Sequence, residues 1–257
     1  MAKHRKEAIK TKILILNTIL VFIFIISISL IIYKKESETK THLLDNIQIN
    51  IAEDIDEDKD EKSEGILRLE ELQKENSDIK AYIEIDGTNI SYPVLQTTDN
   101  SYYMKKNYKK EYSNDGSIFL DKDVKLELPS TNFLIYGHNN KNDTMFNELL
   151  KYKDKEFYNQ YPYIKFITNT QESEFEIIAV FYSRVYYKSE KNVFRYYYFI
   201  NAENEEEFNN YINKSKKASI YDTEKTSTYG DQLLTLSTCS YHTEDGRFAI
   251  VAKKINI

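Results

Sequence analysis

Residues 13–33 form a predominantly apolar stretch, and this segment restricts the architecture of the chain more than any other. It contains no charged residue, and as an α-helix it would be about 31 Å long, which matches the hydrocarbon thickness of a bilayer. A cleaved signal peptide is the alternative interpretation, but the apolar region of a signal peptide is usually only about 7–15 residues long. We therefore predict an uncleaved transmembrane anchor that holds the rest of the chain beside a lipid bilayer.

The charges before this anchor predict its orientation, and those after it predict a stalk. Residues 1–12 contain five basic side chains and one acidic side chain, so the positive-inside rule makes them a cytoplasmic tail and puts everything after residue 33 outside the cell. Residues 34–65 form a spacer, in which eight of the twelve residues at 53–64 are acidic. Such a stretch repels itself, and we predict a solvated extracellular stalk. It lacks the glycine and glutamate that an EF-hand loop needs at its sixth and twelfth positions, so we expect no calcium site.

Residues 66–257 have the composition of a globular domain. Short apolar segments rich in β-branched and aromatic residues alternate there with turn signals, which is typical of β-strands. A short helix is expected near its start, because the apolar residues of 66–72 share one face, and two more helices are expected at 144–152 and 202–217. This pattern indicates a mainly β fold, a closed or nearly closed β-barrel with helical insertions. The expected strands are residues 81–85, 90–95, 117–120, 132–136, 163–168, 174–186, 232–237 and 247–255.

The composition excludes several classes of function. Lys and Arg number 35 and Asp and Glu number 41, and the resulting net charge of −6 argues against a protein that binds nucleic acid by neutralising its phosphates. The hydrophobic share of 41% is sufficient for a core and is too high for a disordered chain. The single cysteine excludes an intrachain disulfide and a cysteine-rich metal site. We expect no metal ion and no other cofactor.

The single cysteine, Cys239, comes at the end of a predicted strand. The apolar residues of that strand give way to Ser237 and Thr238 immediately before the thiol. Exposed functional groups are usually presented by strand ends and by the loops that follow them. A buried small side chain and a handle for intermolecular pairing are the alternatives for a lone extracellular cysteine, but its placement favours a reactive thiol.

Four histidines are candidates for a partner to this thiol. His4 lies in the predicted cytoplasmic tail and His42 in the predicted stalk, so neither qualifies. His242 lies three residues after Cys239, but no second pair of ligands exists to complete a metal site, and a solvent-facing loop residue is the simpler explanation. His138 ends another predicted strand and is therefore the favoured partner, with a hydrogen-bonded turn histidine as its alternative interpretation.

Arg247 opens the last predicted strand and is the candidate cation. It follows Glu244, Asp245 and Gly246, so a surface salt bridge to one of the two acids is the ordinary explanation for its presence. A glycine immediately before the arginine is also what a side chain presented from a tight turn would need.

Taken together, these motifs resemble the sortases, the thiol transpeptidases that join secreted proteins to the cell wall of Gram-positive bacteria. The resemblance rests on TLSTC at 235–239, on RFAIVAKKI beginning at Arg247 and on IYGHN at 135–139. The segment 92–121 and the helical insertion at 202–217 resemble the class B branch of the family. The likeness extends over roughly residues 66–257, and the predicted anchor agrees with the usual topology of the family.

The resemblance implies a closed eight-stranded β-barrel and a catalytic trio. By residue-to-residue match, Cys239 would be the catalytic cysteine, His138 the catalytic histidine and Arg247 the catalytic arginine. Such an enzyme would cleave the C-terminal sorting signal of a secreted protein after Thr, and would pass the acyl group through a thioester to an amine of a peptidoglycan precursor or cross-bridge. Ser237 and Leu95 match family positions that line the substrate groove.

Two other functions stay open on the sequence. A membrane-anchored extracellular cysteine protease would release an acid in place of an amide, and a non-enzymatic stalked binding module would carry its cysteine incidentally. The family pattern also breaks at residues 181–198, which are unusually rich in tyrosine, so substrate contacts there do not follow from the resemblance. The expected location is the cell membrane of a Gram-positive bacterium, with a single pass and the catalytic domain outside.

Overall fold

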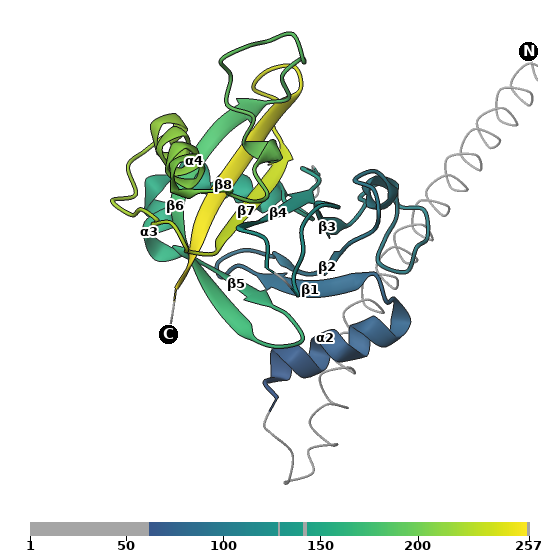
Figure 1. The fold of residues 1–257 in the computed structure, drawn as a ribbon. Coiled ribbons are helices and arrows are strands. Elements are labelled where there is room, and N and C mark those ends of the chain that lie inside the picture. The colour runs from purple at the N-terminus through teal and green to yellow at the C-terminus, as the bar shows by residue number, and fades with distance from the viewer. Residues whose placement is uncertain (1–61, 128, 141–142, 256–257) are drawn as a thin grey trace, which may run out of the picture. The chain divides into compact units, whose positions relative to one another are not determined.

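Eight strands of the described chain close into a β-barrel in the order β1-β2-β3-β4-β7-β8-β6-β5 (Figure 1). This arrangement confirms the predicted mainly β fold and the eight-stranded barrel. Among the described strands the β2–β3 and β4–β7 pairs are parallel, and the other pairs are antiparallel. The strands are β1 (Ile79–Glu84), β2 (Ser91–Leu95), β3 (Ile118–Leu120), β4 (Asn132–Gly137), β5 (Tyr163–Ile167), β6 (Glu172–Arg184), β7 (Leu233–Cys239) and β8 (Gly246–Ile255).

The computed structural model describes residues 62–127, 129–140 and 143–255. The predicted cytoplasmic tail, the predicted anchor at 13–33 and most of the predicted stalk lie outside these residues. Within the part that is described, no helix combines the length and the apolar character that a membrane span requires.

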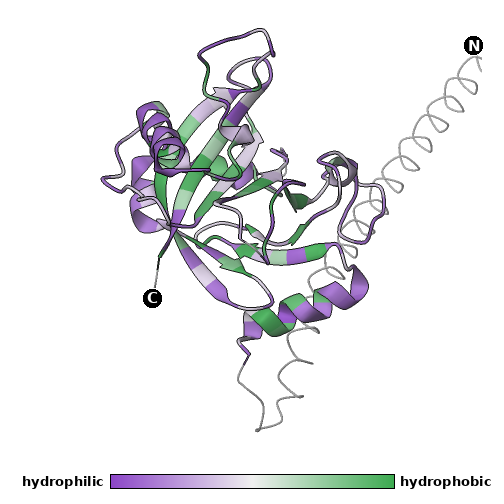
Figure 2. Cartoon of the chain, in the orientation of Figure 1, coloured by the Kyte–Doolittle hydropathy of each residue, from purple (hydrophilic) through white to green (hydrophobic). Residues whose placement is uncertain are grey.

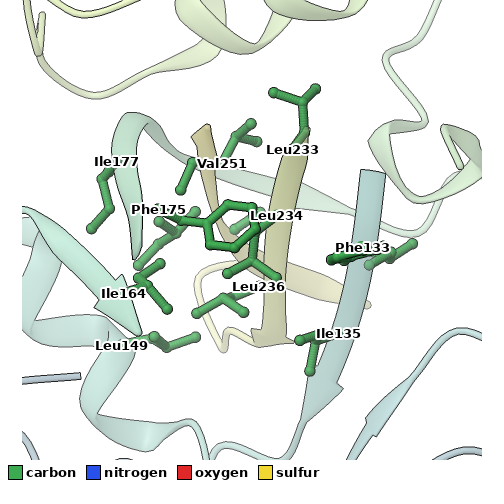
Figure 3. Packing of buried hydrophobic residues seen from close by; sticks show 14 of the residues in the cluster. Phe133, Ile135, Leu149, Ile164, Phe175, Ile177, Leu233, Leu234, Leu236 and Val251 are labelled. Atoms are coloured by element: carbon green, nitrogen blue, oxygen red, sulfur yellow. The ribbon is translucent and has the colours of Figure 1, made fainter. Parts of the chain in front are cut away.

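The strand β7 is buried along almost its whole length. Leu234 and Leu236 lie among the buried side chains of the barrel core, close to Phe175 and Ile164 in Figure 3. Residues of opposite parity on a strand point to the opposite face, and on that face the hydroxyl of Thr235 bonds the hydroxyl of Tyr211 at 2.9 Å. Because both faces of β7 are covered, six of its seven residues are buried, and only Cys239 at its end is half-buried.

The helix α2 (Glu64–Glu75) precedes the barrel and matches the helix expected near residue 66. It begins at Ser63, whose side chain accepts a hydrogen bond from the backbone of Ile66, as an N-cap residue does. Ile66, Leu69 and Leu72 are buried, and each such side chain contributes roughly 1.5–3 kcal/mol when it leaves water. They pack with residues of β1, β2 and β3 in a second apolar cluster at the side of the barrel.

The insertion between β6 and β7 contains the helix α4 (Glu205–Ala218), close to the predicted range of 202–217. Its first turn is acidic and its last turn is basic, which suits the helix dipole. Phe208, Tyr211 and Ile212 are buried, whereas the outward side of α4 is hydrophilic (Figure 2).

The helix predicted at 144–152 is present over most of its range, but as a 3-10 helix. The structure has a 3-10 helix there, η2 (Asn147–Lys153), and a separate short helix, α3 (Lys155–Gln160). Asp154 separates the two because its backbone is extended and its side chain caps α3. Two further 3-10 helices of the described chain, η1 (Tyr102–Lys105) and η3 (Tyr196–Tyr198), lie in loops.

Candidate active site

Strand pairing brings the three candidate residues to one edge of the barrel. In the parallel β4–β7 pair, Gly137 lies opposite Thr238, so His138 and Cys239 are the next residues at the same end of two neighbouring strands. In the antiparallel β7–β8 pair, Cys239 lies directly opposite Arg247, where Cα atoms are about 4.5–5.5 Å apart. Cys239 therefore lies between His138, just past the end of β4, and Arg247 on β8.

Cys239 is a free, half-buried cysteine. Its backbone carbonyl accepts a hydrogen bond of 2.9 Å from the side-chain amide of Asn139, and the oxygen of that amide accepts one of 2.7 Å from Asn147. Because Asn139 directly follows His138, this hydrogen bond joins the end of β4 to the residue that carries the thiol. The sequence predicts no role for Asn139, although it stands in the IYGHN motif, because its partner is a backbone carbonyl and leaves no sequence signal.

His138 is held by a backbone oxygen from the loop between β2 and β3. Its Nε2 lies 2.8 Å from the carbonyl oxygen of Met104. A carbonyl oxygen can only accept a hydrogen bond, so Nε2 carries the hydrogen and Nδ1 is the nitrogen that can take up and release a proton. The contact thus fixes both the tautomer and the orientation of the ring.

Gly116 forms the surface against which this imidazole rests. Its φ is +61°, and a Cβ at that position would lie 2.8 Å from Cδ2 of His138 and 2.8 Å from the carbonyl oxygens of Met104 and Tyr103. Only a residue without a side chain satisfies both the backbone conformation and the space. No sequence pattern distinguishes this glycine from an ordinary turn glycine, and its role emerges only in the folded chain.

Arg247 makes none of the ion pairs found among residues 62–127, 129–140 and 143–255. Its Nη1 donates instead to the backbone carbonyls of Asp245 and Gly246, at 3.2 and 2.9 Å. The surface salt bridge that the neighbouring acids suggested is therefore not formed in the described structure, and the turn itself orients the guanidinium. Arg247 thus lies opposite Cys239 with no carboxylate of the described residues paired to it.

Beneath these three groups lies a buried layer of hydroxyls. Ser237 is 2% exposed, and its hydroxyl lies 2.7 Å from that of Tyr196, a residue of the tyrosine-rich segment. Burial raises the pKa of Tyr196, and the hydrogen bond with Ser237 and the charge of Arg247 oppose this only in part. Burial and the neighbouring Asp121 likewise raise the pKa of Tyr136. Both phenols are neutral at physiological pH, so they do not cancel the charge of Arg247.

The two predicted substrate-binding residues are both buried, in different parts of the barrel. Ser237 lies two residues before Cys239 on β7, whereas Leu95 is fully buried in the second apolar cluster. A substrate would reach either side chain only after a rearrangement, and both assignments stay predictions. Among the described residues, no group of three or more His, Cys, Asp or Glu is placed to hold a metal ion.

Comparison with known proteins gives a consistent result. A model of the sortase domain matches residues 83–255. Sortase B of Listeria monocytogenes is 36% identical over 191 residues, which cover 73% of this chain and 74% of the relative. The structure of a Staphylococcus aureus sortase B–substrate complex superposes with a TM-score of 0.71 at 25% identity and covers 87% of this chain and 98% of that one. A sortase B complexed with triglycine superposes with a TM-score of 0.73 at 26% identity, over 87% and 99% of the two chains.

The strand register brings a free cysteine, a histidine and an arginine together at one edge of a closed barrel. With the family match and the relatives above, the chain belongs to the sortase family and to its class B branch. It is a cysteine transpeptidase of cell-wall sorting, from a family associated with the wall and membrane of Gram-positive bacteria.

Proposed function

We propose that this protein cleaves a C-terminal sorting signal after Thr, holds the acyl fragment as a thioester on Cys239, and transfers it to an amine of the cell wall. The observation that carries the proposal is the register of β4, β7 and β8, in which Gly137 pairs with Thr238 and Cys239 pairs with Arg247. This register supports a site in which nucleophile, proton donor and fixed cation act on one carbonyl group.

In the first half of the reaction Cys239 is the nucleophile and His138 is the acid. The thiolate is the reactive form of cysteine, and its Sγ attacks the carbonyl carbon of the threonine to form a tetrahedral intermediate. When the intermediate collapses, the carbon–nitrogen bond breaks, and the departing amine takes a proton from Nδ1 of the His138 imidazolium. The fragment before the cleaved bond remains as a thioester on Sγ.

In the second half, an amine replaces the thiol. The nitrogen of the acceptor attacks the thioester carbonyl carbon, Nδ1 of His138 accepts the proton that the nitrogen loses, and Sγ leaves as the thiolate. Atoms and charges balance over the cycle without a redox step. The sortase B complex with triglycine is a related protein with an oligoglycine bound, and it supports an amine of a peptidoglycan cross-bridge or precursor as the acceptor here.

Arg247 stabilises the oxyanion that forms in both halves. It has a permanent positive charge and a planar set of N–H donors, and among the described residues no carboxylate pairs with it. A fixed cation beside the reacting carbonyl stabilises the charge that develops in the transition state more than the neutral ground state.

We also propose the domain order that such an enzyme requires at a cell surface. Residues 1–12 would be a cytoplasmic tail, 13–33 the membrane anchor, 34–65 the acidic stalk and 66–257 the catalytic domain. The stalk would hold the barrel away from the headgroups, where it can meet secreted proteins as they emerge. Protease digestion of intact cells tests this order, because only the residues after 33 should be cleaved.

Intact-mass spectrometry with a panel of sorting-signal peptides tests the reaction. We expect the full chain to gain the mass of the peptide fragment that ends in Thr, and to release this fragment as an amide when an amine is added. Cys239→Ala should gain no mass. Release of the free acid alone, whatever amine is present, would favour the cysteine protease, and the lack of an adduct with every peptide would favour the binding module.

A further inference from the structure

Tyr103 is a buried residue in a loop whose neighbouring side chains are exposed. Tyr102 and Met104 on either side of it are 37% and 43% exposed, whereas Tyr103 is 1% exposed. Its ring packs in the second apolar cluster with Leu69 and Leu72 of α2. The buried ring of Tyr103 thus fastens the loop of residues 96–117, which joins β2 to β3, to α2.

The hydroxyl of Tyr103 adds a directional connection to this packing. It donates a hydrogen bond of 2.7 Å to the carboxylate of Asp78 and accepts one of 2.9 Å from the side-chain amide of Asn76. Asn76 is 4% exposed, forms the C-cap of α2 and also donates to the backbone carbonyl of Tyr108 at 2.6 Å. Two residues at the end of α2 therefore fix the position of the phenol.

Only one peptide unit separates the buried Tyr103 from the carbonyl that contacts His138. Met104 follows Tyr103 in the 3-10 helix η1, and its carbonyl oxygen is the acceptor 2.8 Å from Nε2 of His138. The carbonyl of Tyr103 itself accepts from the backbone of Ser117 at 2.9 Å. A displacement of the Tyr103 ring would therefore move the Met104 carbonyl relative to the imidazole that it contacts, because the two residues are joined by one peptide bond.

We propose that Tyr103 is a positioning residue for His138, and that the C-terminal end of α2 holds it in place through Asn76 and Asp78. Asn76 at the end of α2 and the following Asp78 bond the phenol of Tyr103, the next residue carries the Met104 carbonyl, and this carbonyl contacts the imidazole. This role rests on the proposed function of His138 as the acid and base of the transfer. It makes α2, which lies outside the barrel, part of the support of the catalytic site.

The variant Tyr103→Phe tests the proposal, because it removes only the hydroxyl and keeps the ring. Tyr152→Phe is the matched control: Tyr152 is also fully buried, and its hydroxyl donates to the carbonyl of Tyr161 at 2.7 Å, in the main core. We expect kcat of Tyr103→Phe to fall by about 10- to 100-fold, the range associated with small displacements of a catalytic group, with KM unchanged. Tyr152→Phe should lose thermal stability and keep its kcat.

A readout that needs no turnover separates this proposal from the proposed function. The full chain is labelled with ¹⁵N-histidine in a Cys239→Ala background, and the ring signals of His138 are assigned by their loss in His138→Gln. At a pH where the ring is neutral, we expect the hydrogen of the parent ring to be on Nε2. Tyr103→Phe should give a mixture of tautomers, whereas Tyr152→Phe should give the parent spectrum.

The outcomes distinguish the two claims. A parent spectrum and parent kcat in Tyr103→Phe would overturn the positioning role, even if transfer by the parent is efficient. A protein that transfers no acyl group would refute the proposed function, while the tautomer measurement would still decide the structural claim. If Tyr103→Phe fails to fold, Asn76→Ser serves in its place, because serine is too short to reach the phenol, and the same shift in the His138 signals is expected.

Discussion

The two sides of the site are held in place by different kinds of contact. Cys239 and Arg247 are directly opposite residues of the β7–β8 ladder, so regular backbone hydrogen bonds set their separation. His138 lies just past the end of β4 and depends on the carbonyl of Met104 and on the space left by Gly116, both in the 96–117 loop. The nucleophile and the cation are therefore positioned by the sheet, and the acid–base group is positioned by a loop.

This difference has a physical consequence for tolerance to mutation. A ladder position depends on many backbone bonds that no single side chain supplies, so side-chain changes there should alter chemistry more than geometry. A loop position depends on a few side-chain contacts, and the loss of one of them should alter geometry first. The following variants, in order of decreasing expected effect, separate the two cases.

Arg247→Ala should have the largest effect. Removal of one oxyanion donor in other enzymes costs about 2.7–4 kcal/mol, or roughly 10²–10³ in kcat, and we expect a loss in this range with the fold intact. Arg247→Lys should recover the activity only in part, because an ammonium lacks the planar set of donors. Steady-state kinetics and thermal unfolding measure the two properties separately. Full activity in Arg247→Lys would show that charge alone is sufficient.

Gly116→Ala should have the second largest effect, because the 96–117 loop has no space for a side chain at this position. Gly230 provides a matched control: its φ of +103° is also positive, but no other group lies within 4 Å of the place that a Cβ would take. Both alanines should destabilise the fold by about 1–2 kcal/mol through backbone strain, and only Gly116→Ala should also lower kcat, since it displaces His138. Denaturant unfolding and kcat are measured for both, and an equal kcat would contradict the role of the loop.

Tyr196→Phe, which changes a residue packed against β7, should have a smaller effect on kcat. It removes the hydrogen bond with Ser237, and a hydrogen bond of this kind contributes about 0.5–1.5 kcal/mol. Tyr211→Phe removes the comparable bond with Thr235, two residues further from Cys239 on the same strand. We expect similar losses of stability by thermal unfolding and a modest loss of kcat in Tyr196→Phe alone. If kcat falls equally in both, the effect is one of general packing.

Asp78→Asn should give the smallest effect, and it should depend on pH. Burial opposes ionisation of Asp78, but hydrogen bonds from Lys110 and Tyr103 hold its pKa below the usual value. A carboxyl group with a lower pKa in the folded state stabilises the fold above its unfolded pKa, near 3.9, and this contribution is lost as the pH falls through the folded pKa. Because the side chain is 26% exposed, solvent reduces the contribution.

The melting temperature measured between pH 2 and pH 7 tests this last prediction. We expect Asp78→Asn to lie slightly below the parent at pH 7 and to lose less of its stability as the pH falls below about 4. The exposed Asp123, which pairs with Lys122, provides the control, and Asp123→Asn should follow the parent curve. Parallel curves for Asp78→Asn and the parent would refute a contribution from this carboxylate.

Local sequence patterns are sufficient to predict the strands of the barrel and the helix in the β6–β7 insertion. Alternation of apolar residues and turn signals depends only on neighbours in the chain, so the strands predicted at 232–237 and 247–255 lie close to the observed β7 and β8. The same reasoning finds the helical segment at 144–152 but misses that it is a 3-10 helix that ends before Asp154. The break at Asp154 depends on a side-chain cap and on helices of only one or two turns, which are too short to produce a clear periodicity in the sequence.

The tertiary structure alone decided how the site is assembled. The pairing of β4 with β7 joins segments about a hundred residues apart, and no local propensity specifies such a register. The Met104 carbonyl that fixes the tautomer of His138, and the Cys239 carbonyl that binds Asn139, are backbone groups present in every residue. Since a backbone carbonyl is the same whatever side chain its residue carries, only the folded chain shows which carbonyls meet the imidazole and the amide.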